Sequence, residues 1–73
     1  MASYKLRTFK GTVTRFFPER AYGHVKIDGL AREAQVHLGD CEFGGHEIRQ
    51  GTRLEFYLEQ RPKGLNAIRV SLL

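Results

Sequence analysis

The chain has 73 residues, with twelve Lys and Arg against eight Asp and Glu, which gives a formal net charge of +4 at pH 7. This length leaves no room for a second domain or a long linker, so we expect residues 1–73 to form a single domain with a small core. An excess of positive charge favours an anionic partner, which could be nucleic acid, an acidic protein or a membrane surface. No stretch is apolar enough for a signal peptide or a membrane span, so we expect a cytoplasmic protein with no membrane-embedded segment.

The first three predicted strands lie in the N-terminal half of the chain. Residues 9–17 (FKGTVTRFF) are rich in Thr, Val and Phe, and Pro18 prevents a helix from running through their end. In residues 22–27 (YGHVKI), a ring, an imidazole and an ammonium share one parity, while Gly, Val and Ile share the other. Residues 33–38 (EAQVHL) place Ala, Val and Leu inward and the intervening Gln and His outward.

Two further strands are predicted after a long loop. Residues 52–60 (TRLEFYLEQ) and 65–72 (LNAIRVSL) alternate apolar and polar side chains, which is typical of a half-buried strand. Gly and Pro mark the turns between the strands, and no segment has sustained helical periodicity.

The most common way to hide the edges of five short strands in so small a chain is a closed barrel. We therefore expect an all-β fold, a five-stranded antiparallel OB-fold barrel, with an SH3-like barrel as the main alternative. The predicted inward residues are Val13, Val25, Ile27, Val36, Leu54, Phe56, Leu58, Ile68, Val70 and Leu72. The direction of Phe16 stays open, because its parity differs from that of Val13 and a bulge would decide it.

Outward side chains of the first three strands form one solvent-exposed face if these strands are neighbours. That face contains Arg15, Phe17, Tyr22, His24, Lys26, Gln35 and His37. Flat rings mixed with cations suit single-stranded nucleic acid, because bases stack on aromatic, imidazole or guanidinium planes while cations follow the phosphates. An ordinary solvated surface is the alternative interpretation.

The sequence carries little sign of other chemistry. Cys41 is the single cysteine, so it can form no disulfide within the chain and has no second thiol for zinc. His24, His37 and His46 do not have the spacing of a zinc site, and no third group orients a Cys–His nucleophilic pair. We expect Cys41 to be a packing residue in a reducing compartment, and we expect no metal, no cofactor and no enzymatic activity.

The chain carries KGTVTRFF at residues 10–17, RAYGHV at 20–25 and AQVH at 34–37, and this order of residues resembles the cold-shock domain family over residues 10–73. Residues 10–17 (KGTVTRFF) stand where the family has Lys-Gly-Thr-Val-Lys-Trp-Phe-Asn. Residues 20–25 (RAYGHV) match its first ribonucleoprotein-like motif, Lys-Gly-(Phe/Tyr)-Gly-Phe-Ile, and residues 34–37 (AQVH) match the second, Val-Phe-Val-His. Residues 50–56 (QGTRLEF) look like the family's Glu-Gly-Gln-x-Val-x-Phe.

This resemblance implies an OB barrel that binds single-stranded RNA or DNA with little sequence preference, as an RNA chaperone or regulator of gene expression, without catalysis or cofactors. It implies stacking positions for Tyr22, His24 and His37 and basic positions near the backbone for Arg20 and Lys63. With the exposed face and the charge of Lys10, the predicted nucleic-acid-binding residues are Lys10, Arg15, Phe17, Arg20, Tyr22, His24, Lys26, Gln35, His37 and Lys63.

Several positions depart from the family pattern. Aromatic residues of the family are replaced at Arg15, His24, Gln35 and Leu38. Because each stacked base contributes roughly 1–3 kcal/mol, we expect weaker or altered binding. Phe17 stands where the family has Asn and adds a ring, while Ala21 replaces a Gly in a turn that can require a positive φ.

Two other functions stay open. One is a ribosome-associated OB-fold protein, similar in size to bacterial translation initiation factor one, which footprinting on the small ribosomal subunit would identify. The other is a protein-interaction module that kept the barrel and lost nucleic-acid binding. In each case we expect a monomer.

Overall fold

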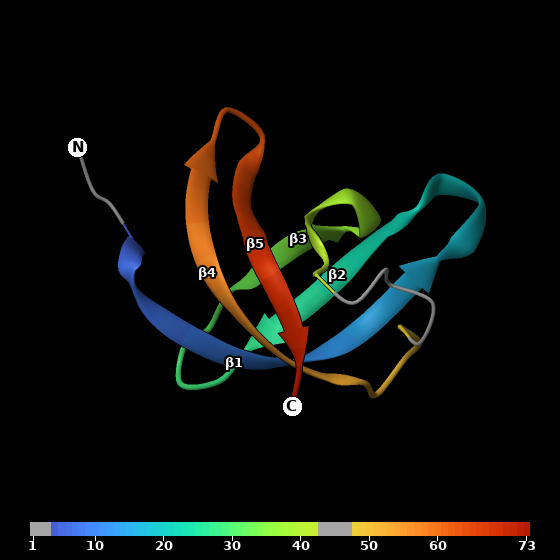
Figure 1. Cartoon of the computed structure of the whole chain (residues 1–73), viewed down its shortest axis with the longest axis horizontal. Coiled ribbons are helices and arrows are strands. Elements are labelled where there is room, and N and C mark those ends of the chain that lie inside the picture. Colours follow the sequence, from blue (N-terminus) through green and yellow to red (C-terminus); the bar gives the residue numbers. More distant parts are fainter. Residues whose placement is uncertain (1–3, 43–47) are drawn as a thin grey trace.

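The computed structural model describes residues 4–42 and 48–73, which form five strands (Figure 1). The strands are β1 (Tyr4–Phe17), β2 (Tyr22–Ile27), β3 (Glu33–His37), β4 (Arg53–Arg61) and β5 (Gly64–Leu72). Short 3₁₀ helices follow two of them, η1 (Pro18–Arg20) after β1 and η2 (Leu38–Asp40) after β3. All five predicted strands are therefore present, although β1 begins earlier than expected and Leu38 belongs to η2 rather than to the third strand. No helix among the described residues is long and apolar enough to span a membrane.

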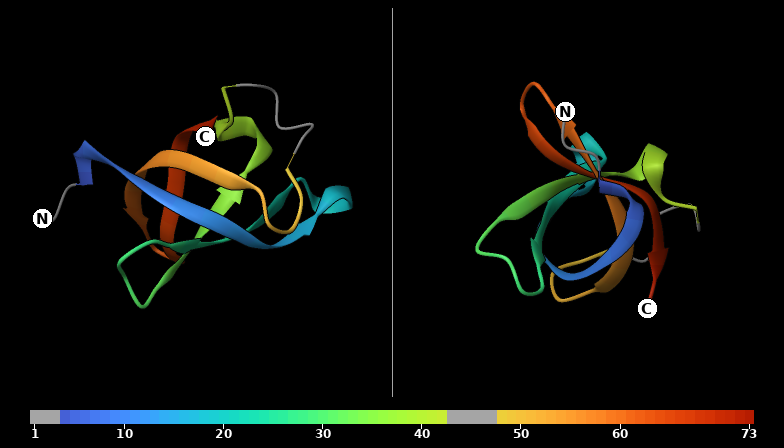
Figure 2. Two further views of the ribbon diagram at one scale, coloured as in Figure 1. Left: turned by 90° about the horizontal axis from the view of Figure 1, so that it is seen from below. Right: turned by 90° about the vertical axis from the view of Figure 1, so that its left-hand side faces the viewer.

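These strands close into a barrel in the order β1-β2-β3-β5-β4, with β4 pairing back to β1. The right-hand view of Figure 2 looks along this barrel. Neighbouring strands are antiparallel except β3 and β5, which pair in parallel at Gln35 opposite Asn66. The predicted all-β, five-stranded OB-fold barrel is confirmed, with this one parallel contact as an addition.

A bulge in β1 decides which side chains of that strand face outward. Val13 pairs with Val25 and Arg15 pairs with His24, so Thr14 is an extra residue in β1. The alternation shifts at this point. As a result, Phe16 packs against the core, although it remains partly exposed.

Gly23 allows β2 to pass close to this part of β1. A Cβ atom at Gly23 would collide with the Arg15 carbonyl oxygen and lie 2.9 Å from Cδ1 of Phe16. Glycine is therefore needed for steric reasons between Tyr22 and His24.

A second bulge breaks the alternation of β5. Ser71 lies opposite Glu55, but the next registered pair is Ile68 opposite Tyr57, so β5 contains one extra residue. Arg69 lies within this step and has a φ of 51°. The inward and outward parities of β5 are exchanged across it.

This exchange corrects the predicted core in β5. Leu65 and Ala67 are buried before the bulge and Val70 is buried after it, whereas Leu72 is 38% exposed. Ile68 is only partly buried. The prediction that Ile68 and Leu72 point inward is wrong, because it continued a period of two across the bulge.

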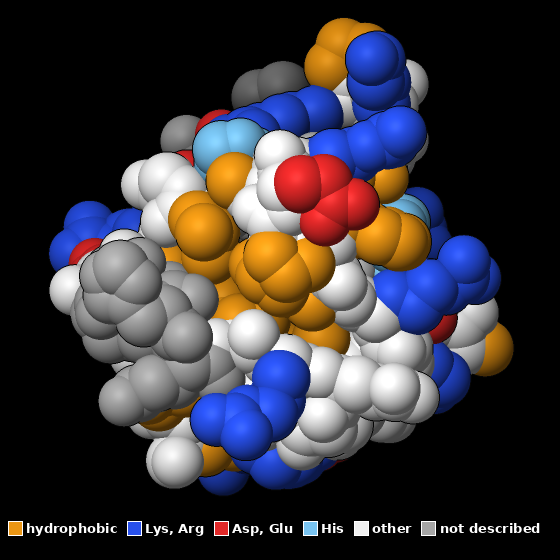
Figure 3. All heavy atoms as spheres, turned by 90° about the vertical axis from the view of Figure 1, so that its right-hand side faces the viewer, with side chains coloured by type: hydrophobic (Ala, Val, Ile, Leu, Met, Phe, Trp, Pro, Cys, Tyr) orange, Lys and Arg blue, Asp and Glu red, His pale blue; other side chains and the backbone are white. Residues whose placement is uncertain are grey.

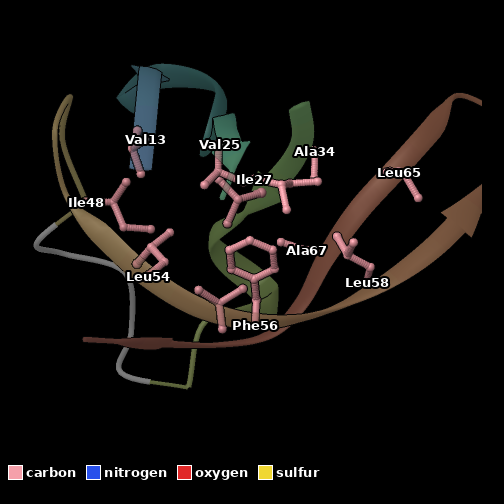
Figure 4. Packing of buried hydrophobic residues seen from close by; sticks show 12 residues of the cluster. Val13, Val25, Ile27, Ala34, Ile48, Leu54, Phe56, Leu58, Leu65 and Ala67 are labelled. Atoms are coloured by element: carbon pink, nitrogen blue, oxygen red, sulfur yellow. The ribbon is translucent and has the colours of Figure 1, made fainter. Parts of the chain in front are cut away.

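The core fills the barrel with aliphatic side chains around Phe56 (Figure 4). Its buried members are Val13, Val25, Ile27, Ala34, Val36, Ile48, Leu54, Phe56, Leu58, Leu65, Ala67 and Val70. Ile48 precedes β4 and lies beside Val13 and Leu54 at one end of the barrel. Burial of each large apolar side chain stabilises the fold by about 1.5–3 kcal/mol, so Ile48 anchors its segment to the barrel.

Candidate nucleic-acid interface

Six outward side chains of β1, β2 and β3 lie in two rows across the strands. One row contains Phe17, Tyr22 and His37, which are direct neighbours across the ladders. The other row contains Arg15, His24 and Gln35. We call these six residues the β1–β3 face. Neighbouring strands lie about 4.8 Å apart, so each row brings three side chains within reach of one ligand.

Three rings of the β1–β3 face touch one another. The ring centroids of Phe17 and Tyr22 are 5.5 Å apart, and those of Tyr22 and His24 are 5.6 Å apart. Phe17 and His24 meet edge to face at 6.4 Å. All three side chains are partly buried, and these distances are typical of favourable aromatic pairs. These contacts therefore hold the three rings in place before any ligand binds. Phe17 contributes a ring at the position where the family pattern has Asn.

His37 is oriented by the start of η2. Its Nδ1 atom accepts a hydrogen bond of 3.0 Å from the Gly39 backbone N–H. In the neutral imidazole this leaves the proton on Nε2, which is free to donate. The ring is exposed and can meet a ligand from solvent.

The turn before Tyr22 uses a left-handed residue. Ala21 has φ 57° and ψ 34°, and its N–H donates to the Pro18 carbonyl at 3.1 Å. Its own carbonyl accepts from the Leu38 N–H at 2.9 Å, which connects this turn to η2. The family pattern has Gly at this position, and the turn does require a positive φ. Here Ala21 adopts that conformation.

Of the predicted cations, the structure places Arg15 within the β1–β3 face and Lys26 next to it. Lys26 is exposed on β2, one step beyond His24, and its Nζ donates to the Leu30 carbonyl at 2.8 Å. Arg20 is exposed on η1, in the connection between Phe17 and Tyr22. Both Lys26 and Arg20 therefore flank the rings rather than lying among them.

Lys10 is exposed on β1 but lies beyond Lys26, near the acidic residue Asp28. The Arg53 guanidinium donates to the Asp28 carboxylate at 2.6 and 3.0 Å. The pKa of Asp28 is lowered, first by these hydrogen bonds and further by the charges of Arg53, Lys26 and Lys10. Lys10 therefore belongs to a partly neutralised cluster in the middle of β1, opposite Asp28, and the structure does not bring it to the rings.

Lys63 lies in the β4–β5 turn, on the same hairpin as Arg61. A hollow of about 440 Å³ lies between this hairpin and the β1–β3 face, and Tyr22, His37, Arg61 and Asn66 help to line it. The parallel contact between β3 and β5 creates this neighbourhood. Sequence reasoning missed Arg61 and Asn66, because no local pattern indicates which strand lies beside β3.

Glu33 is an acidic neighbour that sequence reasoning also missed. It lies on β3 opposite Lys26, with the same outward parity as Gln35. Its Oε2 accepts from the Thr14 hydroxyl at 3.0 Å, and its Oε1 is 4.0 Å from Nδ1 of His24. A carboxylate therefore lies at the edge of the rings, where its negative charge would repel a phosphate.

Cys41 packs beside His37 and does not act as its nucleophilic partner. The Cys41 Sγ donates to the His37 carbonyl at 3.5 Å, and the residue packs partly buried against the core. Burial, together with the charge of Asp40, raises the pKa of the Cys41 thiol to about 11, so at neutral pH it is a protonated packing group.

Over residues 4–42 and 48–73, no three His, Cys, Asp or Glu side chains gather as metal ligands. The candidate ligand His46 lies outside the described residues.

Comparison with known proteins identifies a family for this chain. The sequence profile of the 'Cold-shock' DNA-binding domain matches residues 9–73. The Major cold shock protein of Micrococcus luteus is 33% identical over 64 residues, which cover 86% of this chain and 96% of that protein. The solved structure of Drosophila Unr CSD456 superposes on 92% of this chain with a TM-score of 0.77 and 19% identity, which shows the shared fold. This chain matches 27% of the length of that larger one.

Proposed function

The chain belongs to the cold-shock domain family, and we propose that it binds single-stranded nucleic acid, RNA or DNA, across the β1–β3 face without catalysing a reaction on it. The observation that carries this proposal is the contact cluster of Phe17, Tyr22 and His24, in which His24 pairs directly with Arg15 across the ladder. Planar groups that solvent can reach on an outer face stack on bases. A duplex hides its base faces, so the cluster favours an open strand.

We expect the proposed binding to depend little on the base sequence of the bound strand. Every base has a face that can stack, and stacking contributes roughly 1–3 kcal/mol per base. Arg15, Lys26, Arg20 and Lys63 supply positive charge around the rings for the phosphates, and Gln35 and His37 supply polar groups for base edges. By holding open strands, the protein would compete with weak base pairing, which is the action of an RNA chaperone.

We also propose that the protein acts as a monomer. Each of the five strands pairs with two neighbours in the closed barrel, so no described strand is open to a second copy along a whole side. This supports a monomer of one domain. We propose that it acts in the cytoplasm without a metal ion or cofactor, as a nucleic-acid-binding protein and not an enzyme.

Titration with oligo-dT, oligo-U and a duplex of equal length, each at two salt concentrations, tests the proposal. For single strands, log K falls with log salt at about −0.7 per neutralised phosphate, so three to four contacts predict a slope of about −2 to −3. We expect the single strands to bind more tightly than the duplex. If nothing binds at low salt, the proposal is wrong and the interaction-module alternative is favoured.

A further inference from the structure

The β1–β3 face continues around the end of the barrel into a second hollow. This hollow has a volume of about 350 Å³ and lies between residues 14–18 and residues 48–50. Arg15 and Phe17 belong both to it and to the β1–β3 face. We call it the end groove. A strand that leaves the rings at Phe17 would enter it directly.

Local backbone contacts hold both walls of the end groove. On one side, the bulge at Thr14 turns Phe16 toward the core. On the other side, the Arg49 N–H donates to the Thr52 hydroxyl and the Thr52 N–H donates to the Arg49 carbonyl, both at 3.0 Å. The Gly51 N–H donates to the Val13 carbonyl at 2.8 Å, which fastens this turn to β1. The end groove is thus built from ordered backbone.

The end groove combines an apolar wall with two guanidinium groups. Phe16, Phe17, Pro18 and Ile48 form the apolar part, and the charged side chains among its lining residues are Arg15 and Arg49. Figure 3 views this end of the barrel, where hydrophobic side chains gather at the centre and Lys and Arg side chains surround them on several sides. The nearby acid Glu19 is exposed on η1 and is not one of the lining residues.

We propose that the end groove binds one further nucleotide of the same single strand, with its base on the apolar wall and its phosphate on Arg15 and Arg49. This inference rests on the proposed function and extends the path of the strand beyond the β1–β3 face. A volume of about 350 Å³ is near the lower limit of ligand sites, roughly 300–1,000 Å³, and suits one nucleotide rather than a longer segment. The shared residues Arg15 and Phe17 make this site continuous with the rings, and its positive charge matches a phosphate.

Oligonucleotides of different length distinguish binding in the end groove from binding on the β1–β3 face alone. The rings of Phe17, Tyr22, His24 and His37 offer stacking positions for roughly four bases, so a tetranucleotide can be bound by the face alone. An octanucleotide is long enough to reach the end groove as well. The test therefore compares oligo-dT of four and of eight residues.

The experiment measures both dissociation constants for wild type, Arg49→Gln and the matched control Arg69→Gln. Arg69 is an exposed arginine on β5 whose Nε lies 3.5 Å from Glu42, so its replacement removes the same charge elsewhere on the barrel. For Arg49→Gln we expect five- to tenfold weaker binding of the octamer, less than twofold change for the tetramer, and a salt slope reduced by about 0.7 for the octamer. Gln50→Glu, which adds a carboxylate to the end groove, should weaken the octamer in the same length-dependent way. Arg69→Gln should leave both constants unchanged.

Equal losses for the two lengths, or no loss for either, would overturn the inference. In both cases the wild type still binds, so the proposed function stands while the end groove does not hold a nucleotide. If the wild type binds neither length at low salt, the proposed function itself fails. Thermal midpoints of the variants establish that each one is folded.

Discussion

Ala21 adopts a left-handed backbone conformation, with φ 57° and ψ 34°, directly before Tyr22. This conformation costs an L-residue with a side chain about 1–2 kcal/mol, and glycine avoids most of that cost at the expense of greater entropy in the unfolded chain. We expect Ala21→Gly to raise the free energy of unfolding by about 0.5–1 kcal/mol in urea denaturation, with the m value unchanged. Ala34→Gly is the control, because it removes a buried methyl group from extended backbone and should lower stability. A loss of stability in both variants would show that the turn does not strain Ala21.

Glu33 places a carboxylate beside the rings, with its Oε1 atom 4.0 Å from Nδ1 of His24. Because the proposed path of the strand brings phosphates to this region, Glu33→Gln should tighten oligonucleotide binding three- to tenfold at low salt, and the gain should shrink as salt screens the charge. Glutamine can still accept the hydrogen bond from Thr14.

Glu55→Gln is the matched control for this prediction. Glu55 also accepts from a threonine, Thr8, at 3.1 Å, but it lies on the outside of β4 away from the β1–β3 face. Its replacement should leave affinity unchanged. An equal gain in the two variants would mean that only net charge matters and that the strand does not pass Glu33.

Arg53 connects three parts of the barrel. From β4 it donates to the Thr12 hydroxyl of β1 at 2.8 Å and to Asp28, which follows β2. The pKa of Asp28 is lowered below 3.8, mainly by these hydrogen bonds from Arg53. A carboxyl group with a depressed folded-state pKa stabilises the fold above its unfolded-state pKa, and this contribution is lost as pH falls through the folded-state value.

Asp28→Asn should therefore lower the thermal midpoint at pH 7, and its difference from wild type should diminish progressively below pH 3.8. Thermal unfolding of the two proteins from pH 7 to pH 2 tests this. A difference that persists undiminished at pH 2 would show that the contribution of Asp28 does not depend on its charge.

The strands could be predicted because alternation with a period of two is a local property of the sequence. The bulges at Thr14 and Arg69 could not, because neither residue is a glycine or another recognisable marker. The direction of Phe16 and the exposure of Leu72 both depend on these bulges. Ile48 was missed for a related reason, since it lies outside any alternating segment.

In the candidate site, too, the features set by local sequence could be predicted and those set by distant strand pairing could not. Parity along single strands correctly placed Tyr22 and His24 on one exposed face. Arg61 approaches His37 only through the pairing of β3 with β5, which lies far away in sequence. The binding roles of all these residues remain predictions.

Ion pairs neutralise several positive charges of the molecule. Arg53 and Arg61 each lie 2.6 Å from a carboxylate oxygen, of Asp28 and Glu59 respectively. Exposed pairs of this kind add little stability, but they reduce the field available to attract phosphates. We therefore expect stacking on the ring cluster to contribute more to affinity than net charge does.

Two tyrosines on different sides of the barrel test whether this ring cluster binds the strand. Tyr22 touches Phe17 and His24 on the β1–β3 face, whereas Tyr57 is a partly buried residue on the outside of β4, near Arg69 and Ser71. The measurement is the affinity of each alanine variant for oligo-dT at fixed salt, together with its thermal midpoint. Tyr22→Ala should lose roughly 1–3 kcal/mol of binding, about 5- to 150-fold, with little change in midpoint, while Tyr57→Ala should bind like wild type. Equal affinities for the two variants would show that the ring cluster does not bind the strand, and unfolding of Tyr22→Ala would show that this ring belongs to the core.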